Sequence, residues 1–247
     1  MNTPTATTIT WADLVRLKKA AKAAKAAFPN LTHTQRLDVL AQNEFGARHF
    51  HELQQRYEAH VASYVELAGF HHCRFCHLNF SDYDAGDQKL HRERHQQFEE
   101  AQLALGFLPL PVKIREDMKR DFGYEQLYRG DAAARRMGAL AIILSHYDRS
   151  LERAIANGRW HKHPCLAEYL PCAVSNSTFL GGDVLLQLAE EFGERPGVIV
   201  EGDTDWPANV QCQAGCGSAE AAASKQLRET ILAAYRAAQV AVTAPSV

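Results

Sequence analysis

The first part of the chain repeats apolar residues with the period of an α-helix. From Trp11 to Phe28 these apolar positions form one stripe, while cationic residues occupy much of the remaining surface. The stripe consists of Leu14, Leu17, Ala21, Ala24 and Phe28. Pro29 cannot continue a helix, so the helix is predicted to end before it. Residues 1–10 are largely polar and carry no such pattern, and we expect them to form a disordered tail.

Two more helices are predicted before residue 68. Thr32 and Gln35 have the spacing of a capping box, in which two side chains satisfy backbone N–H groups at a helix start. Gly46 interrupts the pattern that follows, and a third helix is expected after it. The predicted three-helix unit covers residues 11–68, with helices at Trp11–Phe28, Thr32–Gln42 and Ala47–Leu67.

The second half of the chain is also mainly helical in pattern. Its clearest feature is a long amphipathic helix that ends at Asn157 and Gly158, residue types common at a helix C-terminus. Val198–Val200 is a short apolar run that predicts a buried strand, and Glu220–Val240 predicts a closing helix. Residues 107–130 begin with a Pro-containing stretch, and we expect a linker there. The apolar face of the long helix comprises Met137, Leu140, Leu144, Leu151 and Ile155.

Four residues between these two parts have the spacing of a metal site. The pattern is Cys73-x2-Cys76-x14-His91-x3-His95. Thiolate and imidazole are the ligands that Zn²⁺ prefers, and four of them close a tetrahedral structural site. The two histidines are four residues apart, so both project from one face of a helix. We therefore predict a small ββα zinc finger over residues 69–106, folded by the metal rather than by a hydrocarbon core.

Two alternatives to this ligand set stay open at the level of sequence. The spacing can arise by chance in a chain that contains 12 histidines. His72 or His77, which lie beside the two cysteines, can also replace one of the four ligands.

The finger segment resembles the finger of a known family. Cys76 is followed four residues later by an aromatic residue, Phe80, and Asp87 stands four residues before His91. Together with the run Cys73-Arg-Phe-Cys76, these features resemble the finger at the head of cohesin acetyltransferases, over about 30 residues. The resemblance implies zinc ligation by the same four residues. It does not extend to acetyl transfer, because the chain has no acetyl-CoA loop of closely spaced glycines after basic residues.

The helix of this finger is poorly suited to reading DNA bases. Counted back from the first histidine ligand, the positions that face bases in DNA-reading fingers are Asp84, Asp87 and Leu90. Two acids repel phosphate and make poor partners for base edges. A finger that is structural or that contacts protein is therefore expected.

A basic surface on the first helix is the candidate contact for nucleic acid. Its cations are Arg16, Lys18, Lys19, Lys22 and Lys25. Each phosphate that they neutralise would strengthen salt-sensitive binding to DNA or RNA. The alternative is a solvated helix face. The chain has a net charge of −2, but its first 136 residues carry 19 Lys+Arg against 17 Asp+Glu and the remainder carries 8 against 12.

The same N-terminal segment is similar to small helical domains of plasmid- and phage-borne bacterial proteins. The shared pattern is a basic helix, Thr-x-x-Gln-Arg-Leu from Thr32, then Phe45-Gly46 and an aromatic-rich helix. The resemblance implies a bacterial, mobile-element origin and carries no ligand or catalytic residue. Ala41 and Gly46 also resemble a helix-turn-helix, although they are five residues apart where that motif has four.

Metal-type residues also occur in the second half of the chain. They are His161, His163, Cys165, Cys172, Cys212 and Cys216. Together they could form a second zinc site that joins two distant loops. The alternative is a set of buried structural residues, because free Cys behaves as a small hydrophobe.

Asp203 and Asp205 follow the predicted strand, and carboxylates at the end of a strand can bind a divalent cation for hydrolysis. His146 and Asp148 could assist them. The alternative is a solvated acidic loop. The chain has no phosphate-cradling glycine loop, nucleophile elbow or His-Glu-x-x-His motif, so an enzyme is the less favoured hypothesis.

These patterns predict a mainly α protein with an N-terminal three-helix unit, a small ββα zinc finger, and an α-rich C-terminal domain with little strand over residues 131–240, before a tail at 241–247. No segment approaches the roughly 18 apolar residues of a membrane span, and the start of the chain does not resemble a signal peptide, which favours the cytoplasm. The first functional hypothesis is a zinc-binding accessory or regulatory protein that docks on DNA or RNA. A zinc-stabilised protein–protein interaction adaptor is the alternative, and a metal-dependent hydrolase is the third.

Overall fold

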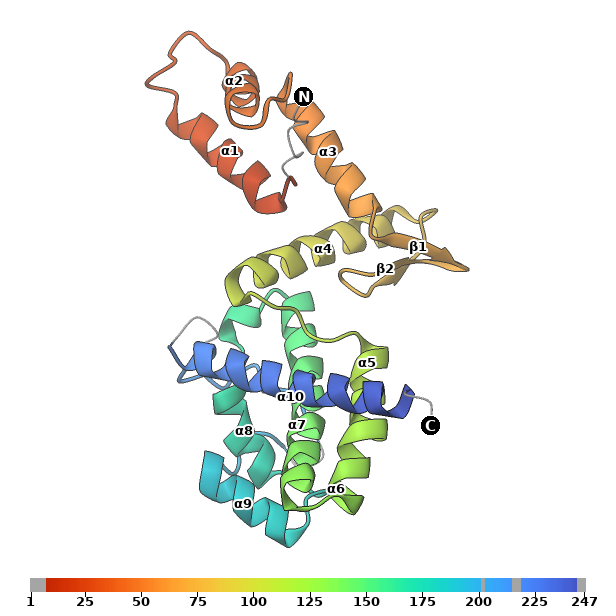
Figure 1. The fold of residues 1–247 in the computed structure, drawn as a ribbon. Helices are drawn as coiled ribbons and strands as arrows, with labels where there is room; N and C mark the ends of the chain where they lie inside the picture. Colours follow the sequence, from red (N-terminus) through yellow and green to blue (C-terminus); the bar gives the residue numbers. More distant parts are fainter. Residues whose placement is uncertain (1–7, 201–202, 215–218, 244–247) are drawn as a thin grey trace, which may run out of the picture. The chain divides into compact units, whose positions relative to one another are not determined.

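The computed structural model describes residues 8–200, 203–214 and 219–243. The chain is mainly helical, and one small antiparallel sheet is present among these residues (Figure 1). It divides into two compact units, Met1–Leu103 and Ala104–Val247, named unit 1 and unit 2.

Unit 1 begins with three helices, α1 (Trp11–Ala23), α2 (His33–Phe45) and α3 (Phe50–Ala62). Thr10 and Thr32 cap α1 and α2 through capping boxes, which satisfy N–H groups that a helix start leaves open. Gly46 ends α2 in the left-handed conformation with φ 61°, a backbone state that glycine adopts without strain. Residues 46–49 form the short turn that joins α2 to α3.

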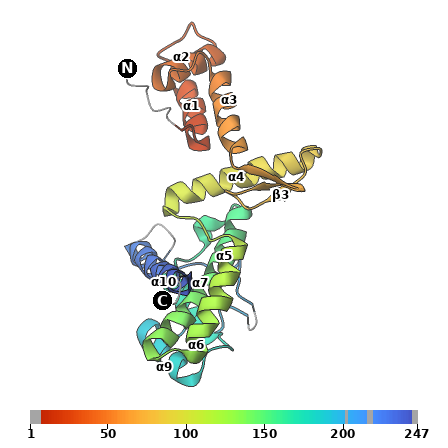
Figure 2. The ribbon, with the colours of Figure 1, turned by 45° about the vertical axis from the view of Figure 1, so that its right-hand side comes forward.

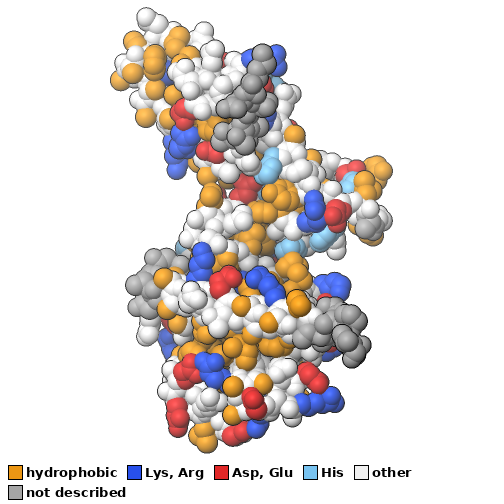
Figure 3. Space-filling view, in the orientation of Figure 1, with side chains coloured by type: hydrophobic (Ala, Val, Ile, Leu, Met, Phe, Trp, Pro, Cys, Tyr) orange, Lys and Arg blue, Asp and Glu red, His pale blue; other side chains and the backbone are white. Residues whose placement is uncertain are grey.

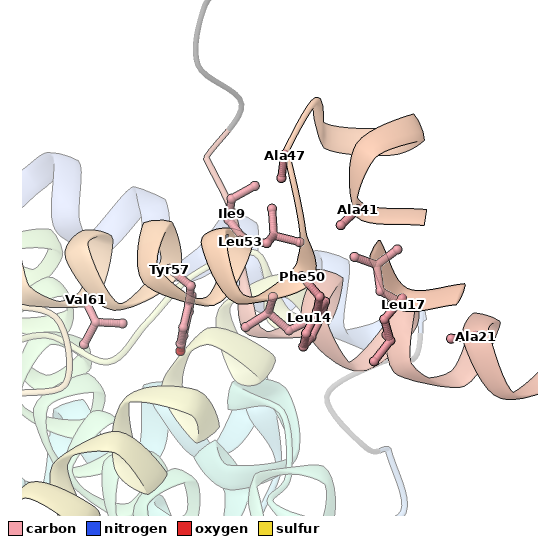
Figure 4. Close-up of a cluster of buried hydrophobic side chains, with 11 residues drawn as sticks. Ile9, Leu14, Leu17, Ala21, Ala41, Ala47, Phe50, Leu53, Tyr57 and Val61 are labelled. Carbon is pink, nitrogen blue, oxygen red and sulfur yellow. The ribbon is translucent and has the colours of Figure 1, made fainter. Parts of the chain in front are cut away.

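The three helices share one hydrophobic core, drawn in Figure 4. The apolar stripe predicted for the first helix supplies Leu14, Leu17 and Ala21. The other buried members are Ile9, Leu37, Ala41, Ala47, Phe50, Leu53, Tyr57 and Val61. Because Ile9 is buried and Thr10 caps α1, the end of the segment predicted to be a tail belongs to this fold.

A small sheet and a long helix complete unit 1 (Figure 2). The elements are β1 (Val65–Ala68), β2 (Phe70–Cys73), β3 (Asn79–Phe80) and α4 (Ala85–Leu105). The strands pair antiparallel in the order β1-β2-β3. Val65 pairs with Cys73, and His71 pairs with Phe80. Since alternate side chains of a strand point to opposite faces, these four side chains share one face of the sheet.

Unit 2 is organised around one long central helix, α7, which contacts each of the other helices described in that unit. The helices are α5 (Val112–Asp117), the π-helix η1 (Met118–Tyr124), α6 (Glu125–Arg129), α7 (Ala132–Ala156), the 3-10 helix η2 (Trp160–Lys162), α8 (Leu166–Ser175), α9 (Gly182–Phe192) and α10 (Ala219–Thr243). Fully buried side chains of α7 include Ile142, Ile143, Leu144 and Leu151.

The π-helix η1 lies against α7 at a pair of glycines. A Cβ added to Gly138 would come within 2.5 Å of the Gly123 carbonyl oxygen and 2.8 Å of the Leu127 nitrogen. A Cβ added to Gly123 would come within 2.7 Å of the Ile142 side chain. The two backbones therefore approach so closely that only glycine is accommodated at these positions.

A buried ion pair ties α7 to α10. The Asp148 carboxylate is fully buried, and its Oδ2 accepts hydrogen bonds from Arg228 Nη2 at 2.8 Å and from the Leu110 N–H at 2.8 Å. Burial raises the pKa of Asp148, and the charge of Arg228 opposes that rise. Removing either partner would leave a buried charge uncompensated.

Two of the predicted helices of unit 1 are shorter in the structure. The first ends at Ala23 rather than Phe28, because Arg36 Nε donates to the Ala21 carbonyl oxygen and the chain turns away. The third ends at Ala62, and residues 65–68 form strand β1 instead of its last turn.

Two elements of the second half also differ from the prediction. The expected linker at residues 107–130 contains α5, η1 and α6, which contact α7. Val198–Val200 is not a strand, although Ile199 is buried. Among the helices described, none is both long enough and apolar enough to cross a membrane.

The contact between η1 and α7 gives a test of the fold. Gly138→Ala should lower the free energy of unfolding by about 1–3 kcal/mol, because the added methyl group overpacks a backbone contact. Chemical denaturation followed by circular dichroism measures this change. Gly182→Ala is the matched control, since a Cβ there meets no atom within 4 Å, and it should be neutral or slightly stabilising. Equal stability of the two variants would contradict the close approach.

Candidate metal centre

The four predicted ligands converge in unit 1. Cys73 ends β2, Cys76 lies in the turn that follows, and His91 and His95 occupy one face of α4. One ligand atom from each residue lies within 4.8 Å of the others. All four residues are buried, with exposed fractions of 0% for both cysteines, 5% for His91 and 0% for His95. A buried group of two sulfurs and two imidazole nitrogens is the donor set of a structural metal site.

The turn between the strands brings the two sulfurs together. The Cys73 N–H donates to the Leu78 carbonyl oxygen at 3.0 Å, and the His77 N–H donates to the Cys73 carbonyl oxygen at 2.8 Å. His77 adopts a left-handed conformation with φ 58°, which closes this tight turn. Arg94 Nε also donates to the Cys76 carbonyl oxygen at 2.8 Å and so ties the turn to α4.

Two acidic residues build the start of the helix that carries the histidines. Asp84 Oδ1 accepts hydrogen bonds from the Gly86 N–H at 2.7 Å and the Asp87 N–H at 3.0 Å. Asp87 Oδ2 accepts a hydrogen bond from the Ser81 N–H at 3.0 Å. The Asp84 contacts cap the N-terminus of α4, the Asp87 contact ties the preceding loop to the first turn, and negative charge at a helix N-terminus is favourable.

Aromatic rings hold the two imidazoles in place. Phe80 stacks on His91 with ring centroids 4.1 Å apart and an interplanar angle of 12°. Phe75 packs against His95 with ring centroids 4.5 Å apart. Packing on these rings restricts the orientations that both imidazoles can adopt, which prepares them to act as ligands.

The polar atoms of the cluster lack protein partners that would satisfy them. His91 Nε2 and His95 Nε2 are both buried and have no hydrogen-bond partner among the described residues. His95 Nδ1 lies 3.5 Å from Cys73 Sγ. The neighbouring Cys76, followed by His91 and His95, lowers the pKa of Cys73, which favours a thiolate there. An ion would satisfy these atoms, whereas a buried polar atom without a partner costs about 1–3 kcal/mol.

The neighbouring histidines are not part of this cluster. The group that the structure assembles contains neither His72 nor His77. His72 Nδ1 instead lies 2.8 Å from Asn79 Oδ1, across the strand pair β2–β3.

One site residue was not anticipated from the sequence. Glu99 follows His95 by one turn of α4, is buried, and places Oε1 3.4 Å from His95 Nε2. Its only sequence signal is the spacing of four residues from a ligand, which puts both side chains on one helix face.

The predicted second metal group is not assembled by the residues that the structure describes. His163 Nε2 lies 2.8 Å from Ser150 Oγ, and Cys172 Sγ donates to the Glu168 carbonyl oxygen at 3.6 Å. Within residues 8–200, 203–214 and 219–243, the finger cluster is the one group of three or more metal-type residues found. The other members of the predicted second group that lie within the described residues are His161, Cys165 and Cys212. Cys216 lies outside the described residues, so a site that includes it stays a prediction.

In the acidic loop, Asp203 and Asp205 do not present their carboxylates to one cation, and the third acid of the loop, Glu201, lies outside the described residues. Asp205 pairs with Arg153, and Asp203 Oδ1 accepts hydrogen bonds from the N–H groups of Thr204 and Asp205. His146 and Asp203 do line one cavity of about 100 Å³, in which Asp203 is the single carboxylate among the described lining residues. Burial lowers the pKa of His146 to about 4. The expected helper Asp148 is instead paired with Arg228, as described above.

The cations of α1 fall into three groups. Arg16 pairs with Glu44 of α2 and lies 3.5 Å from Asp13 Oδ1. Lys18 Nζ packs over the rings of Trp11 and Phe50, 5.6 and 5.7 Å from their centroids. Among the described residues, the exposed cations without an ion pair on or just after α1 are Lys19, Lys22 and Lys25.

No family model matches the chain, and neither a curated protein nor a solved structure matches it. The resemblance of the finger to that of cohesin acetyltransferases therefore stays a prediction, as does the similarity of the N-terminal helices to plasmid- and phage-borne proteins.

The cluster predicts the metal content of the protein. Wild-type protein purified without added metal should contain about one zinc per chain, because four buried ligands make one closed site. Cys73→Ser should lose that zinc, since it removes a thiolate ligand. Inductively coupled plasma mass spectrometry measures both. Cys172→Ser, a buried cysteine of unit 2, is the matched control and should keep the zinc. Wild-type protein without metal would contradict the centre.

Proposed function

We propose that the protein is a zinc-binding accessory or regulatory protein that docks on nucleic acid through its N-terminal helices. The zinc finger has a structural role in this proposal. The separation of charge within unit 1 is the observation that carries it, and the metal cluster supplies the fixed geometry.

The donor set supports zinc as the ion. Two thiolates and two imidazoles suit Zn²⁺, whereas Mg²⁺ and Ca²⁺ take oxygen ligands. All four ligands are buried and come from the protein, which leaves no open coordination position for a substrate. A closed site of this kind stabilises a fold and does not activate water.

Charge is distributed unevenly between the two parts of unit 1. Residues 1–62 contain 8 Lys+Arg and 5 Asp+Glu, which gives +3, and residues 63–103 contain 4 and 7, which gives −3. The exposed lysines of α1 belong to the positive part. A polyanion is therefore attracted to the three helices and repelled by the finger.

The acidic residues at the base-facing positions of the finger helix already form hydrogen bonds within the protein. The Asp84 carboxylate caps α4, the Asp87 carboxylate binds the loop N–H of Ser81, and Leu90 is exposed. The three helices are a better platform, because α2 and α3 are joined by a four-residue turn containing Gly46, as in helix-turn-helix units. These features favour docking by the three helices, with the finger as a scaffold.

Salt-dependent binding tests the proposal. The wild type should bind mixed-sequence duplex DNA or RNA with an affinity that falls as salt rises. The combined variant Lys19→Glu, Lys22→Glu, Lys25→Glu should bind more weakly, with a slope of log K against log salt reduced by up to about 3. Fluorescence anisotropy over a salt series gives both quantities. Lys18 is left unchanged because its side chain packs on two rings.

A matched control distinguishes the effect of the α1 surface from the effect of the net charge of the protein. The combined variant Lys113→Glu, Arg120→Glu, Arg129→Glu makes the same change of charge on exposed helices of unit 2. It should keep most of the wild-type affinity. Equal losses in both variants, or binding that does not respond to salt, would refute docking through α1.

A second candidate function has its own supporting observation. The tip of the β1–β2 hairpin and the loop before α4 expose Leu67, Phe70 and Tyr83, with exposed fractions of 82%, 71% and 97%. The two segments are adjacent, because His71 Nδ1 lies 3.5 Å from Asp82 Oδ1. Figure 3 shows hydrophobic side chains on this part of the surface beside acidic, basic and histidine side chains. Exposed apolar side chains flanked by acids favour a protein partner with basic and apolar residues, which is the adaptor function.

Site-specific photo-crosslinking tests the adaptor function. A crosslinking amino acid at Phe70 should capture one defined protein, and Tyr83→Ser should lower the yield several-fold because it removes neighbouring apolar contact. The same amino acid at Tyr128, an exposed residue of unit 2, serves as the control. Identical products from both positions would count against a specific partner.

A further inference from the structure

Glu99 lies between the metal cluster and the helix that carries the exposed lysines. It belongs to α4, one turn after the ligand His95, and only 7% of it is exposed. A carboxylate is seldom buried to this degree unless it is paired or hydrogen-bonded. Its contacts therefore explain its position.

The two carboxylate oxygens serve different parts of unit 1. Glu99 Oε1 lies 3.4 Å from His95 Nε2, which is within ion-pair distance but does not form a hydrogen bond in this structure. Glu99 Oε2 accepts a hydrogen bond from the backbone N–H of Trp11 at 2.8 Å. One side chain thus touches both a predicted metal ligand and the first residue of α1.

A third contact connects the same carboxylate to α3. Tyr57 extends from α3 on the side of α4 (Figure 4), where the Glu99 carboxylate is close enough to influence its hydroxyl group. Burial and then the nearby Glu99 carboxylate raise the pKa of Tyr57. The rings of Tyr57 and Trp11 are also in contact, with centroids 6.1 Å apart.

The orientation of the His95 ring determines which nitrogen faces the metal cluster and which faces Glu99. His95 Nδ1 faces Cys73 Sγ at 3.5 Å, so Nδ1 is the nitrogen directed at the cluster. When Nδ1 binds a metal, Nε2 carries the ring proton and can donate it to a carboxylate. Such outer contacts fix the orientation of a ligand histidine.

The hydrogen bond from the Trp11 N–H to the Glu99 carboxylate stabilises the start of α1. The first N–H groups of a helix have no partner within the helix, and a negative charge near them is stabilising. Thr10 and Asp13 already form a capping box at the start of α1. Glu99 adds a charged cap that comes from the metal-binding helix.

We propose that Glu99 is a positioning residue that couples metal occupancy of the finger to the seating of α1 on α4. The bound ion would fix the orientation of the His95 ring, and the ring would fix the position of the Glu99 carboxylate. The carboxylate in turn accepts the hydrogen bond from the first residue of α1. This inference rests on the proposed zinc centre. It implies that zinc also determines whether the lysine-bearing surface of α1 is presented in a fixed orientation.

Hydrogen exchange measured by mass spectrometry tests the coupling on the full-length chain. In the wild type, saturating Zn²⁺ should slow exchange in the first turn of α1, residues 11–14, at least about tenfold relative to chelator-treated protein. In Glu99→Gln the ion should still bind, with an affinity lowered by about 10-fold. The zinc-dependent protection of residues 11–14 should shrink to less than about twofold, because a neutral amide is a weaker acceptor for both donors.

Glu100→Gln is the matched control, since Glu100 is the exposed neighbour on the same helix, and it should behave as the wild type. Native mass spectrometry reports zinc per chain for every variant, and Co²⁺ absorption reports thiolate ligation. Zinc that binds without protecting α1, or that protects it equally in Glu99→Gln, would overturn the coupling and leave the centre intact. Wild-type protein that binds no zinc would overturn the centre and the coupling together.

Discussion

The sheet and α4 of unit 1 meet at a cluster of buried Cys and His side chains, whereas the three N-terminal helices share an apolar core. Between the three-strand sheet and α4, the most deeply buried side chains include Cys73, Cys76 and His95, all of them groups that bind metal. Aromatic rings support the imidazoles from outside, but they do not satisfy the polar atoms inside. The finger is therefore a part whose folding free energy would come largely from ion binding. Through Glu99 the same cluster reaches the helices whose own core is apolar.

Local signals in the sequence predicted part of this arrangement and missed the rest for physical reasons. The ligand set and the capping box at Thr32 depend on short spacings, and the structure brings those residues together. Strand β1 escaped prediction because residues 65–68 continue an apolar pattern from α3, and only pairing with β2 makes them a strand. Glu99 escaped because a glutamate beside a second glutamate on a helix resembles a solvated face. Its partner Trp11 lies far away in sequence.

In unit 2, the burial and pairing of charged residues could likewise not be predicted from the sequence. Asp148 was considered a helper of an acidic catalytic loop, yet its carboxylate is fully buried and is held by Arg228 of α10. Arg115, in the stretch predicted to be a linker, is also buried and pairs with Glu152 of α7. Charge alone does not reveal burial, since the pairing partner comes from a distant helix. Replacing either partner of such a pair would leave a buried charge without a partner, so each pair links the two helices that carry it.

The acids that cap α4 limit how this finger could change in evolution. Asp84 and Asp87 occupy the surface that a DNA-reading finger would use, and they also hold the first turn of the helix and the loop at Ser81. Replacing Asp84 by a base-reading side chain would remove a cap worth about 1 kcal/mol from the helix that carries two of the predicted ligands, and replacing Asp87 would release the loop at Ser81. A descendant that reads bases would therefore need a new helix start before, or together with, a new recognition surface. A single substitution at Asp84 would weaken the helix before any contact with a base is gained.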